Sequence, residues 1–312
     1  MHRRHTALHV LKHRAQNSLM SSSASAPLSQ AESATRTTPT MSSTAASNDV
    51  IPDELRSTWP QRAWTLAGSA AILASFLTTA RLVGVSGSAG PDLLAAAMAA
   101  FAGYSLADLA TGVYHWLIDN YGGAGTPILG AQIAAFQGHH RYPSTITRRE
   151  PCNNLHALAR AAALALVPAD AALSAASAPA AAHAFAGAFA ACVVLSQQFH
   201  AWAHEKRRRL PPGVEALQAA GVLVSRAQHA AHHRQPYNTN YCIVSGMWNG
   251  VLDRYRVFEA LEMVVFLRTS VRPRSWDETD ASWMEVAGDD VAATAAAGDD
   301  GLLQTASSIS SD

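Results

Sequence analysis

The sequence predicts an all-α integral membrane protein with about four transmembrane helices and a histidine-rich site on one membrane face. Three observations support this fold class. Four stretches are long, apolar and nearly uncharged, although charged residues make up 15% of the whole chain. Both ends of the chain are polar. Ten of the 14 histidines lie between residues 115 and 233, most of them in short groups beside the apolar stretches.

The two ends differ from the middle and from each other. Residues 1–50 are rich in Ser, Thr and Ala and carry five basic residues, which is the composition of a transit peptide. The serine runs favour a chloroplast transit peptide over a mitochondrial one. The alternative is a disordered tail without a targeting role. Residues 277–312 hold nine acidic residues and no Lys or Arg, which predicts a disordered acidic tail. We therefore expect the membrane-embedded domain at 51–276.

The first two apolar stretches are the clearest candidate spans. Ala63–Ala80 has 18 residues without a charge, close to the minimum for a membrane-crossing helix. Asp92–Asp119 would form a helix of about 42 Å at roughly 1.5 Å per residue. This length exceeds the hydrocarbon core of about 30 Å, so the last turns, with His115 and Asp119, should project from the lipid.

The next two stretches are expected to form a hairpin. Leu155–Val167 is apolar and should end before Pro168, and Ala180–Trp202 is uncharged apart from His183 and His200. The turn is then expected within Pro168–Pro179. Because many of these residues are Ala, a buried helix of a soluble protein is the alternative for any one stretch.

Four spans place all the histidine groups on one side of the membrane. The same side receives most Lys and Arg residues, whereas the opposite loops carry one Arg and two Asp residues. By the positive-inside rule this side is cytosol-like, which in a chloroplast means the stroma. Beyond the fourth span we expect a surface helix at Gly213–His233, a loop at Asn238–Asn249 and an interfacial amphipathic helix at Phe258–Leu267.

The spacing of the histidines brings them together on helix faces. His115 and Asp119 are four residues apart, as are His200 and His204, and residues four apart share one face of a helix. A triple at 229, 232 and 233 and an adjacent pair in the loop at 139 and 140 add five more imidazoles. The candidate metal ligands are His115, Asp119, His139, His140, His156, His200, His204, His229, His232 and His233.

The number and type of these side chains predict two metal ions. Eight clustered imidazoles and one carboxylate exceed the roughly six ligands of one octahedral ion. The three cysteines lie far apart and form no CxxC pair, so the site is nitrogen-rich rather than thiolate. Imidazole suits Fe, Zn, Cu and Ni, and an all-nitrogen pair at a membrane surface favours two iron ions that activate dioxygen.

Some individual residues have simpler interpretations than metal binding. Asp119 either binds a metal or orients the ring of His115. His156 is isolated at the start of an apolar run, where a polar cap is as good an interpretation as a ligand. His183 lies between Ala residues and is expected to be a core histidine with a hydrogen-bond partner.

Two further segments border the histidines. Arg141, Arg148 and Arg149 follow the adjacent pair and could hold a phosphate head group, because guanidinium matches phosphate oxygens in pairs. Interfacial anchoring is the alternative for each of them. Pro236–Cys242 follows the triple, where it could supply amide hydrogen bonds to ligand rings or form a turn.

Four motifs together resemble a known family. They are HWxxDNYG at His115–Gly122, QGHHxxPxxITRRE at Gln137–Glu150, QxHxWxH at Gln198–His204 and QHxxHHxxPYxxxYCIxxGxWN at Gln228–Asn249. Together they look like the plastid fatty acid desaturase 4 family and the related plasmanylethanolamine desaturases. The similarity runs from about residue 60 to residue 276 and leaves out both tails.

The resemblance implies an integral membrane lipid desaturase with a histidine-liganded di-iron centre. The plastid branch implies a trans-3 double bond in the palmitoyl chain of phosphatidylglycerol, formed with O2 and with electrons from ferredoxin. Asp119 stands where common acyl-CoA desaturases have a second histidine. The sequence NNLH at Asn153–His156 resembles the plastid branch and favours His156 as a ligand by analogy.

Three other functions stay open. A lipid hydroxylase would use the same oxidant, and a zinc hydrolase would need fewer ligands and a carboxylate base of the HExxH type. A metal transporter or a non-enzymatic metal-binding protein predicts ionisable residues at mid-membrane depth. Only Asp108, Asp170 and His183 qualify, and we expect them to lie apart. A net charge of zero gives no reason to expect nucleic acid as a partner.

Overall fold

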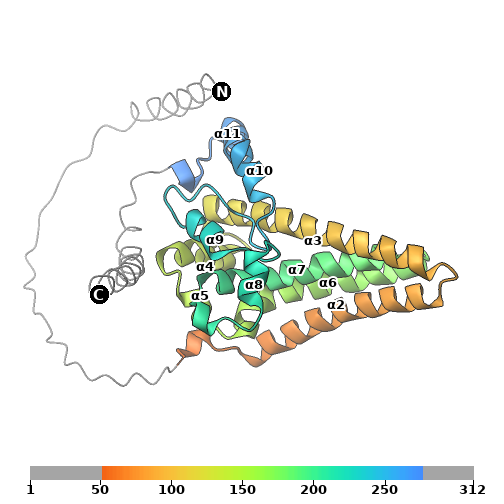
Figure 1. Cartoon of the computed structure of the whole chain (residues 1–312). Helices are drawn as coiled ribbons and strands as arrows, with labels where there is room; N and C mark the ends of the chain where they lie inside the picture. The colour runs from red at the N-terminus through yellow and green to blue at the C-terminus, as the bar shows by residue number, and fades with distance from the viewer. Residues whose placement is uncertain (1–50, 277–312) are drawn as a thin grey trace, which may run out of the picture. The chain divides into compact units, whose positions relative to one another are not determined.

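The computed structural model describes residues 51–276, which are helical and contain no β-strand. Four helices, each apolar and long enough to cross a membrane, form the body: α2 (Trp59–Val85), α3 (Ala89–Asn120), α6 (Pro151–Ala175) and α7 (Ala180–His204). Figure 1 shows them side by side in one elongated bundle. The prediction of an all-α protein with four spans is confirmed. The predicted transit peptide and acidic tail lie outside the described residues.

Small residues let the four long helices pack closely. α3 packs mainly on α7, and α2 packs mainly on α6. A Cβ atom on Gly68 would lie 2.4 Å from the Ala159 carbonyl oxygen, and one on Gly103 would lie 2.6 Å from that of Phe185. Larger side chains are therefore excluded at both crossings, as is common between transmembrane helices. Leucines such as Leu66, which is 71% exposed, form the surface that lipid would cover.

The length of α3 carries its last turns beyond the lipid core. The helix has 32 residues, which corresponds to about 48 Å. The hydrocarbon core takes up about 30 Å of that length. His115 and Asp119 lie in the last two turns of α3, so both extend past the core on the side where the short helices gather.

Pro168 does not end the third span, which corrects the sequence-based prediction. α6 continues through Pro168 to Ala175, and the hairpin turn is confined to Ala176–Pro179. Proline removes one N–H from the helix ladder, but neighbouring transmembrane helices compensate for such a loss. Here α6 packs against both α2 and α7 along its length, and this packing holds the helix together on both sides of the proline.

Two intramembrane ionisable residues form a pair, which also corrects an expectation. His183 Nδ1 lies 2.8 Å from Asp170 Oδ1, and the Ser75 hydroxyl donates to the other oxygen of the same carboxylate. The prediction that His183 is a core histidine with a partner is confirmed. Asp170 and His183 were expected to lie apart, and the close packing of α6 against α7 brings them together.

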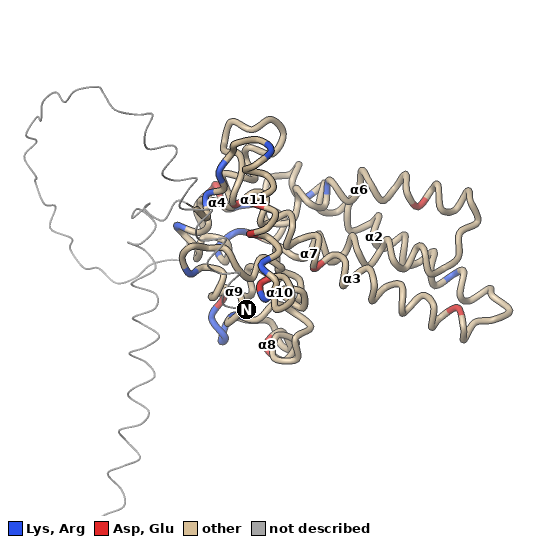
Figure 2. The backbone as a smooth tube through the Cα atoms, turned by 90° about the horizontal axis from the view of Figure 1, so that it is seen from above, with Lys and Arg blue, Asp and Glu red and all other residues tan. Residues whose placement is uncertain are grey.

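The short helices gather at the end of the bundle where α3 and α7 end (Figure 1). They are α4 (Gly130–Arg141), α5 (Thr145–Arg148), α8 (Val214–Ala219), α9 (Arg226–His232), α10 (Asn249–Arg254) and α11 (Val257–Thr269), with the 3-10 turns η1 (Asp53–Leu55), η2 (Arg207–Arg209) and η3 (Arg274–Trp276). Figure 2 shows most Lys and Arg residues at this end and few charges along the spans. The basic residues and the histidines therefore share one end of the molecule.

Three predictions of local structure concern the short helices at this end of the bundle. Gly213–His233 is not one helix, because α8 and α9 are separated by Gly221, whose φ of 71° does not fit a helix. His139 and His140 do not lie in a loop but in the last turn of α4. The helix predicted at Phe258–Leu267 is confirmed as α11.

Candidate metal centre

Five histidines form one group of possible metal ligands, which we call the five-histidine cluster. They come from α4, α7, α9 and the residue after α9: His139, His200, His204, His229 and His233. One ring nitrogen from each lies within 4.8 Å of the others. His139 Nε2 lies 2.9 Å from the Nε2 atoms of both His200 and His204. His229 Nε2 lies 2.7 Å from that of His204 and 3.1 Å from that of His233.

Three histidines and one carboxylate form a second group, which we call the aspartate cluster. Its members are His115, Asp119, His140 and His232, and all four residues are buried. Asp119 Oδ2 lies 3.2 Å from His115 Nε2 and 3.1 Å from His140 Nε2. It lies 3.4 Å from His232 Nε2. A single carboxylate oxygen therefore faces three imidazole nitrogens from three different helices.

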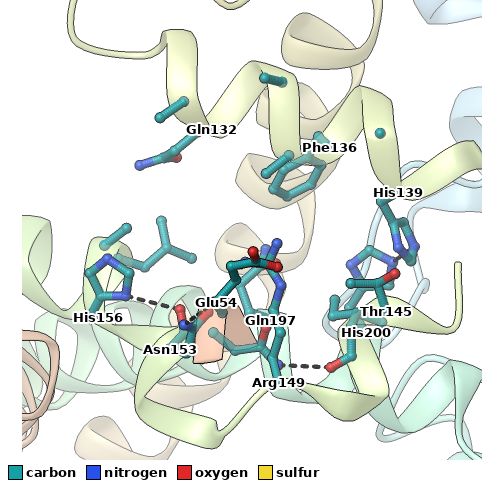
Figure 3. Close-up of a pocket in the computed structure, with 18 of the residues that line it drawn as sticks. Glu54, Gln132, Phe136, His139, Thr145, Arg149, Asn153, His156, Gln197 and His200 are labelled. Carbon is teal, nitrogen blue, oxygen red and sulfur yellow. Dashed lines mark hydrogen bonds between the residues drawn. The ribbon is translucent and has the colours of Figure 1, made fainter. Parts of the chain in front are cut away.

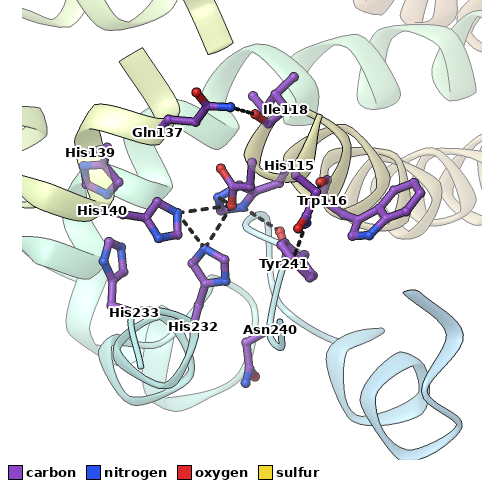
Figure 4. A network of polar contacts seen from close by, with 12 residues as sticks. His115, Trp116, Ile118, Gln137, His139, His140, His232, His233, Asn240 and Tyr241 are labelled. Atoms are coloured by element: carbon purple, nitrogen blue, oxygen red, sulfur yellow. Dashed lines mark hydrogen bonds and ion pairs between the residues drawn. The ribbon is translucent and has the colours of Figure 1, made fainter. Parts of the chain in front are cut away.

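The two clusters are neighbours, as Figure 4 shows for the aspartate cluster and the rings beside it. The ring centroids of His140 and His233 are 4.9 Å apart, and those of His229 and His232 are 5.6 Å apart. His115 and His200 are separated by 5.8 Å between centroids. Adjacent residues of α4 and of the α9 segment thus contribute to different clusters, which fixes the clusters side by side.

The distances fit ligands around a metal better than they fit hydrogen bonds alone. Two nitrogens about 2.1 Å from one ion at a right angle lie about 3.0 Å apart, close to the separations in the five-histidine cluster. His115 Nε2 and Asp119 Oδ1 are buried and make no hydrogen bond to any described residue. Such buried polar atoms are costly unless something binds them. The donor set of both clusters therefore fits a cation.

Backbone carbonyls direct two of the rings toward the aspartate cluster. His115 Nδ1 lies 3.0 Å from the Tyr241 carbonyl oxygen, and His232 Nδ1 lies 2.8 Å from that of Thr239. Since a carbonyl only accepts, Nδ1 carries the proton and Nε2 presents its lone pair to the cluster. The segment after the histidine triple was predicted to support the rings, and it does so through carbonyl oxygens rather than amide groups.

A buried carboxylate on α3 holds this supporting segment in place. Asp108 is 0% exposed, and its Oδ1 accepts from the backbone N–H groups of Val244, Ser245 and Gly246 at 2.8–3.1 Å. Its Oδ2 accepts from Trp248 N at 3.4 Å. Both carboxylate oxygens thus accept hydrogen bonds from the backbone. Asp108 therefore links α3 to the loop whose carbonyls orient the ligand rings.

Burial favours the neutral form of His139, His229 and His233 in the five-histidine cluster. Burial, followed by the neighbouring imidazoles, holds the pKa values of His139, His229 and His233 well below their usual range. Neutral imidazole is the form that binds metals, because the protonated ring has no free lone pair. The cluster therefore needs no deprotonation at neutral pH before it can accept a cation.

A cavity of about 520 Å³ has two members of the five-histidine cluster in its wall. Its lining includes His139 and His200 together with Phe136, Ile146 and Leu158. Figure 3 shows how the residues of α4, α6 and α7 surround it. Residues of all four spans or their ends contribute to its wall, so we call it the span-side pocket.

Polar side chains line part of the span-side pocket. Arg149 is half-buried there and donates to Asn153 Oδ1 at 3.4 Å. Gln197 and Glu54 also line the wall. Burial lowers the pKa of Arg149, as expected for a cation that is partly removed from water. An anionic ligand in this pocket would offset that loss of hydration.

The structure brings nine of the ten predicted metal ligands together. The exception is His156, which belongs to neither cluster. Its Nδ1 lies 2.9 Å from the carbonyl oxygen of Asn153 on the same helix, and its ring lines the span-side pocket. The structure thus places His156 in a pocket wall outside both clusters, and its role as a ligand stays a prediction by analogy. Asp119, which the sequence left between two roles, lies among the ligand atoms.

The three predicted head-group arginines do not share one place. Arg149 alone among them lines the span-side pocket. Arg148 is exposed at the end of α5, and Arg141 is exposed with its guanidinium 5.9 Å from the Tyr142 ring centroid. Arg148 and Arg149 are adjacent in sequence, so the sequence could not say which one faces inward. Gln197 and Asn153 were missed because amides carry no motif of their own.

Comparisons with known proteins identify a family domain that contains this site. A family model described as a lipid desaturase domain matches residues 104–276, which include both clusters. The chain is 49% identical over 228 residues to fatty acid desaturase 4, chloroplastic, of Arabidopsis thaliana, covering 73% of this chain and 68% of that protein. It is 51% identical over 232 residues to fatty acid desaturase 4-like 1, chloroplastic, of the same organism, covering 74% and 76%.

A bacterial relative is more distant. The chain is 31% identical over 182 residues to plasmanylethanolamine desaturase of Myxococcus xanthus, covering 56% of this chain and 62% of that protein. No solved structure matches the chain significantly. The domain match, together with the identities to the Arabidopsis proteins, shows that the chain belongs to the lipid desaturase family, in its fatty acid desaturase 4 branch.

Proposed function

We propose that this membrane lipid desaturase uses two iron ions and O2 to form a trans-3 double bond in the palmitoyl chain of phosphatidylglycerol. Electrons come from a donor protein, with ferredoxin as the candidate. The observation that carries the proposal is the pair of neighbouring ligand clusters, one of which shares a pocket with Arg149 through His139 and His200.

One iron ion would bind in each cluster. The five-histidine cluster supplies nitrogen ligands only, and the aspartate cluster adds the carboxylate of Asp119. Imidazole nitrogen and carboxylate oxygen are both ligands that iron accepts. Iron bound there would activate dioxygen and provide the oxidant needed to remove hydrogen from an unactivated acyl chain.

The span-side pocket supports a lipid substrate with an anionic head group. Its apolar side chains suit an acyl chain, and Arg149 suits a phosphate, since guanidinium binds phosphate oxygens in pairs. Carbon 3 lies close to the ester, so a lipid desaturated there must bring its head group near the oxidant. Arg149, His139 and His200 line the same pocket, which meets this requirement.

The chain's own residues would hold the acyl chain and exclude water. Phe136, Ile146 and Leu158 form apolar walls around the approach to His139 and His200. A fixed acyl conformation decides which hydrogens are removed, and hence both the position and the trans geometry of the double bond.

A chloroplast membrane with the histidine end in the stroma is the proposed location. Two relatives named chloroplastic are about half identical to this chain, and the Ser-rich, basic composition of residues 1–50 suits a transit peptide. Lys and Arg residues at the histidine end support the stromal orientation by the positive-inside rule.

The decisive experiment is expression of the chain in a host that lacks trans-3 hexadecenoate. Positional analysis of the phosphatidylglycerol acyl chains by mass spectrometry is expected to show a new 16:1 chain with its double bond at carbon 3. Hydroxylated palmitate without any 16:1 product would contradict desaturation and favour a hydroxylase on the same ligand set. A double bond at another carbon or on another lipid would contradict the proposed specificity.

A further inference from the structure

A second cavity, of about 740 Å³, reaches the aspartate cluster from another direction. Asp119 and His140 of the cluster form part of its wall. The rest of the lining is formed by Asn120, Tyr121, Gly122, Gln137, Gln235, Pro236, Tyr237, Val271, Arg272, Arg274 and Ser275. We call this cavity the head-side pocket. None of these residues lines the span-side pocket, where the acyl chain is proposed to bind.

The two pockets differ in which part of the protein surrounds them. The span-side pocket takes lining residues from each of the four long helices, for example Gln61, Tyr114, Leu158 and Gln197. The head-side pocket takes residues from only one of them, at the very end of α3. This end lies beyond the lipid core, so the head-side pocket is reached from water.

Desaturation itself requires a supply of electrons from water-soluble chemistry. Conversion of a CH2–CH2 unit to CH=CH releases two electrons and two protons. Reduction of O2 to two water molecules consumes four electrons and four protons. Two further electrons and two protons must therefore come from outside, and an iron–sulfur carrier would deliver the electrons one at a time.

We infer that the head-side pocket is the docking site for an acidic one-electron carrier protein, which delivers electrons to the aspartate cluster. This inference rests on the proposed function. It assigns the two ends of the metal centre to different partners, with the lipid at the five-histidine cluster and the reductant at the aspartate cluster.

The charge of the pocket rim fits an acidic partner. Arg272 and Arg274 line the rim, and Arg274 is exposed while it donates to the Gly122 carbonyl oxygen at 3.0 Å. Glu262, which accepts from Ser275, is only 1% exposed and presents no charge to water. Within residues 51–276, Lys and Arg outnumber Asp and Glu by 18 to 12. Complementary charge mainly speeds and orients such encounters.

Tyr237 extends the wall of the head-side pocket beside the ligand His140. Its ring packs edge-on against His140 with centroids 4.8 Å apart, and Tyr237 lines the head-side pocket. Its backbone has a φ of 58°, a left-handed conformation that is unusual for a bulky residue and is retained where function requires it. A carrier docked over the pocket would therefore face Asp119 and His140, two residues of the aspartate cluster that line its wall.

The test compares the wild-type chain with the double charge reversal Arg272→Glu/Arg274→Glu, each in lipid nanodiscs. The first readout is the Kd for an oxidised plant-type [2Fe–2S] ferredoxin, measured by fluorescence titration at low salt. We expect the Kd to rise about tenfold or more in the variant, because like charges then face each other. Wild-type binding is expected to weaken as salt rises. An unchanged Kd would overturn the inference.

A matched control carries the same charge change elsewhere on the same membrane face. The Arg208→Glu/Arg209→Glu variant alters two exposed residues of η2 that do not line the head-side pocket. Its Kd is expected to stay within about twofold of the wild-type value, since screening limits exposed charges to short range. An equal weakening in both variants would overturn the assignment to this pocket.

A second readout separates docking from chemistry. Dithionite is a small reductant that needs no docking site, so dithionite-driven single turnover is expected to be equal in wild type and in Arg272→Glu/Arg274→Glu. Loss of that turnover in the variant would overturn the docking role, because the arginines would then act on the metal centre itself. Absence of product in the wild type with dithionite would instead contradict the proposed function, while the binding comparison still tests the docking surface.

Discussion

His232 shows how the backbone prepares a single side chain for metal binding. Its ring is buried, with Nδ1 2.8 Å from the Thr239 carbonyl oxygen and Nε2 3.4 Å from Asp119 Oδ2. The carbonyl fixes the proton on Nδ1, so the lone pair of Nε2 faces the cluster. At the residue scale, the site depends on such pairs of a ring and its orienting group as much as on the number of histidines.

Removal of one ring is expected to remove metal without unfolding the bundle. His232→Ala and His200→Ala should each lower iron per chain and abolish product while the protein remains inserted in the membrane. Metal analysis by mass spectrometry and product analysis check this. The matched control is His156→Ala, which lies in the span-side pocket and should keep its iron. Normal activity of His200→Ala or His232→Ala would remove that residue from the ligand set.

Asp119→Asn tests whether the carboxylate belongs to one cluster only. The amide keeps the size of the side chain but loses the negative charge that faces His115, His140 and His232. We expect iron to fall from about two ions to about one per chain, with the five-histidine cluster still loaded. Iron quantified against protein concentration checks this. Retention of both ions would show that Asp119 only orients His115.

Arg149→Ala is expected to weaken use of the lipid without changing iron content. A charged hydrogen bond contributes about 1.5–3 kcal/mol, so the KM for phosphatidylglycerol should rise by about tenfold to a hundredfold. The control is Arg148→Ala, because Arg148 is exposed and does not line the pocket. Equal KM values for the two variants would leave Arg149 without a role in head-group recognition.

The spacing of four predicted that His115 and Asp119 share a helix face, as do His200 and His204, and each pair lies within one cluster. It did not predict that His232 would lie in a different cluster from His229 and His233. It could not predict that His156 turns its Nδ1 to the Asn153 carbonyl of its own helix, since that depends on the local rotamer. Nor could it choose between Arg148 and Arg149, which are adjacent at the end of α5, with only Arg149 lining the span-side pocket. The backbone carbonyls of Thr239 and Tyr241 that orient the rings could not be predicted either, because a side-chain motif does not reveal backbone contacts.

At the scale of helices, close contact between backbones holds the bundle together. The crossing of α2 and α6 occurs at Gly68, and α7 meets α3 at Gly103. The apolar stretches predicted all four helices, and the largest error in their bounds was at the end of α6. A proline rule drawn from soluble helices failed at Pro168, because packing on two neighbouring helices outweighs the loss of one hydrogen bond.

Gly68→Ala and Gly84→Ala provide a matched pair on one helix. A Cβ atom on Gly68 would lie 2.4 Å from the Ala159 carbonyl oxygen, whereas a Cβ atom on Gly84 would meet open space. Gly68→Ala should therefore destabilise the protein by about 1–3 kcal/mol. Gly84→Ala should be neutral or stabilise by up to about 1 kcal/mol, because Ala favours helix. Thermal unfolding in detergent checks this, and equal midpoints would contradict the packing of α2 on α6.

At the scale of the whole molecule, the bundle delivers every cluster residue to one end and leaves a pocket on each side of the metal centre. Four spans explain this from the sequence, because spans two and four exit together. The sequence could not place the head-side pocket, since its wall combines the end of α3 with segments more than 100 residues later. Such a wall forms only when the chain has folded.

The buried histidines should make the iron-free protein sensitive to acid. The folded-state pKa values of His139, His229 and His233 lie below the unfolded value of about 6.5. The unfolded chain therefore binds more protons below that pH, and the free energy of unfolding falls as pH falls through about 6.5. Thermal unfolding of the iron-free protein should show a lower midpoint at pH 5.5 than at pH 7.5. Equal midpoints would contradict burial of neutral imidazoles.

The most direct test of the account is the metal content of the purified protein, measured by inductively coupled plasma mass spectrometry against chain concentration. Two adjacent clusters predict about two iron ions per chain, one for each ligand set. One zinc ion and no iron would contradict the di-iron centre, and with it the proposed desaturation by activated dioxygen.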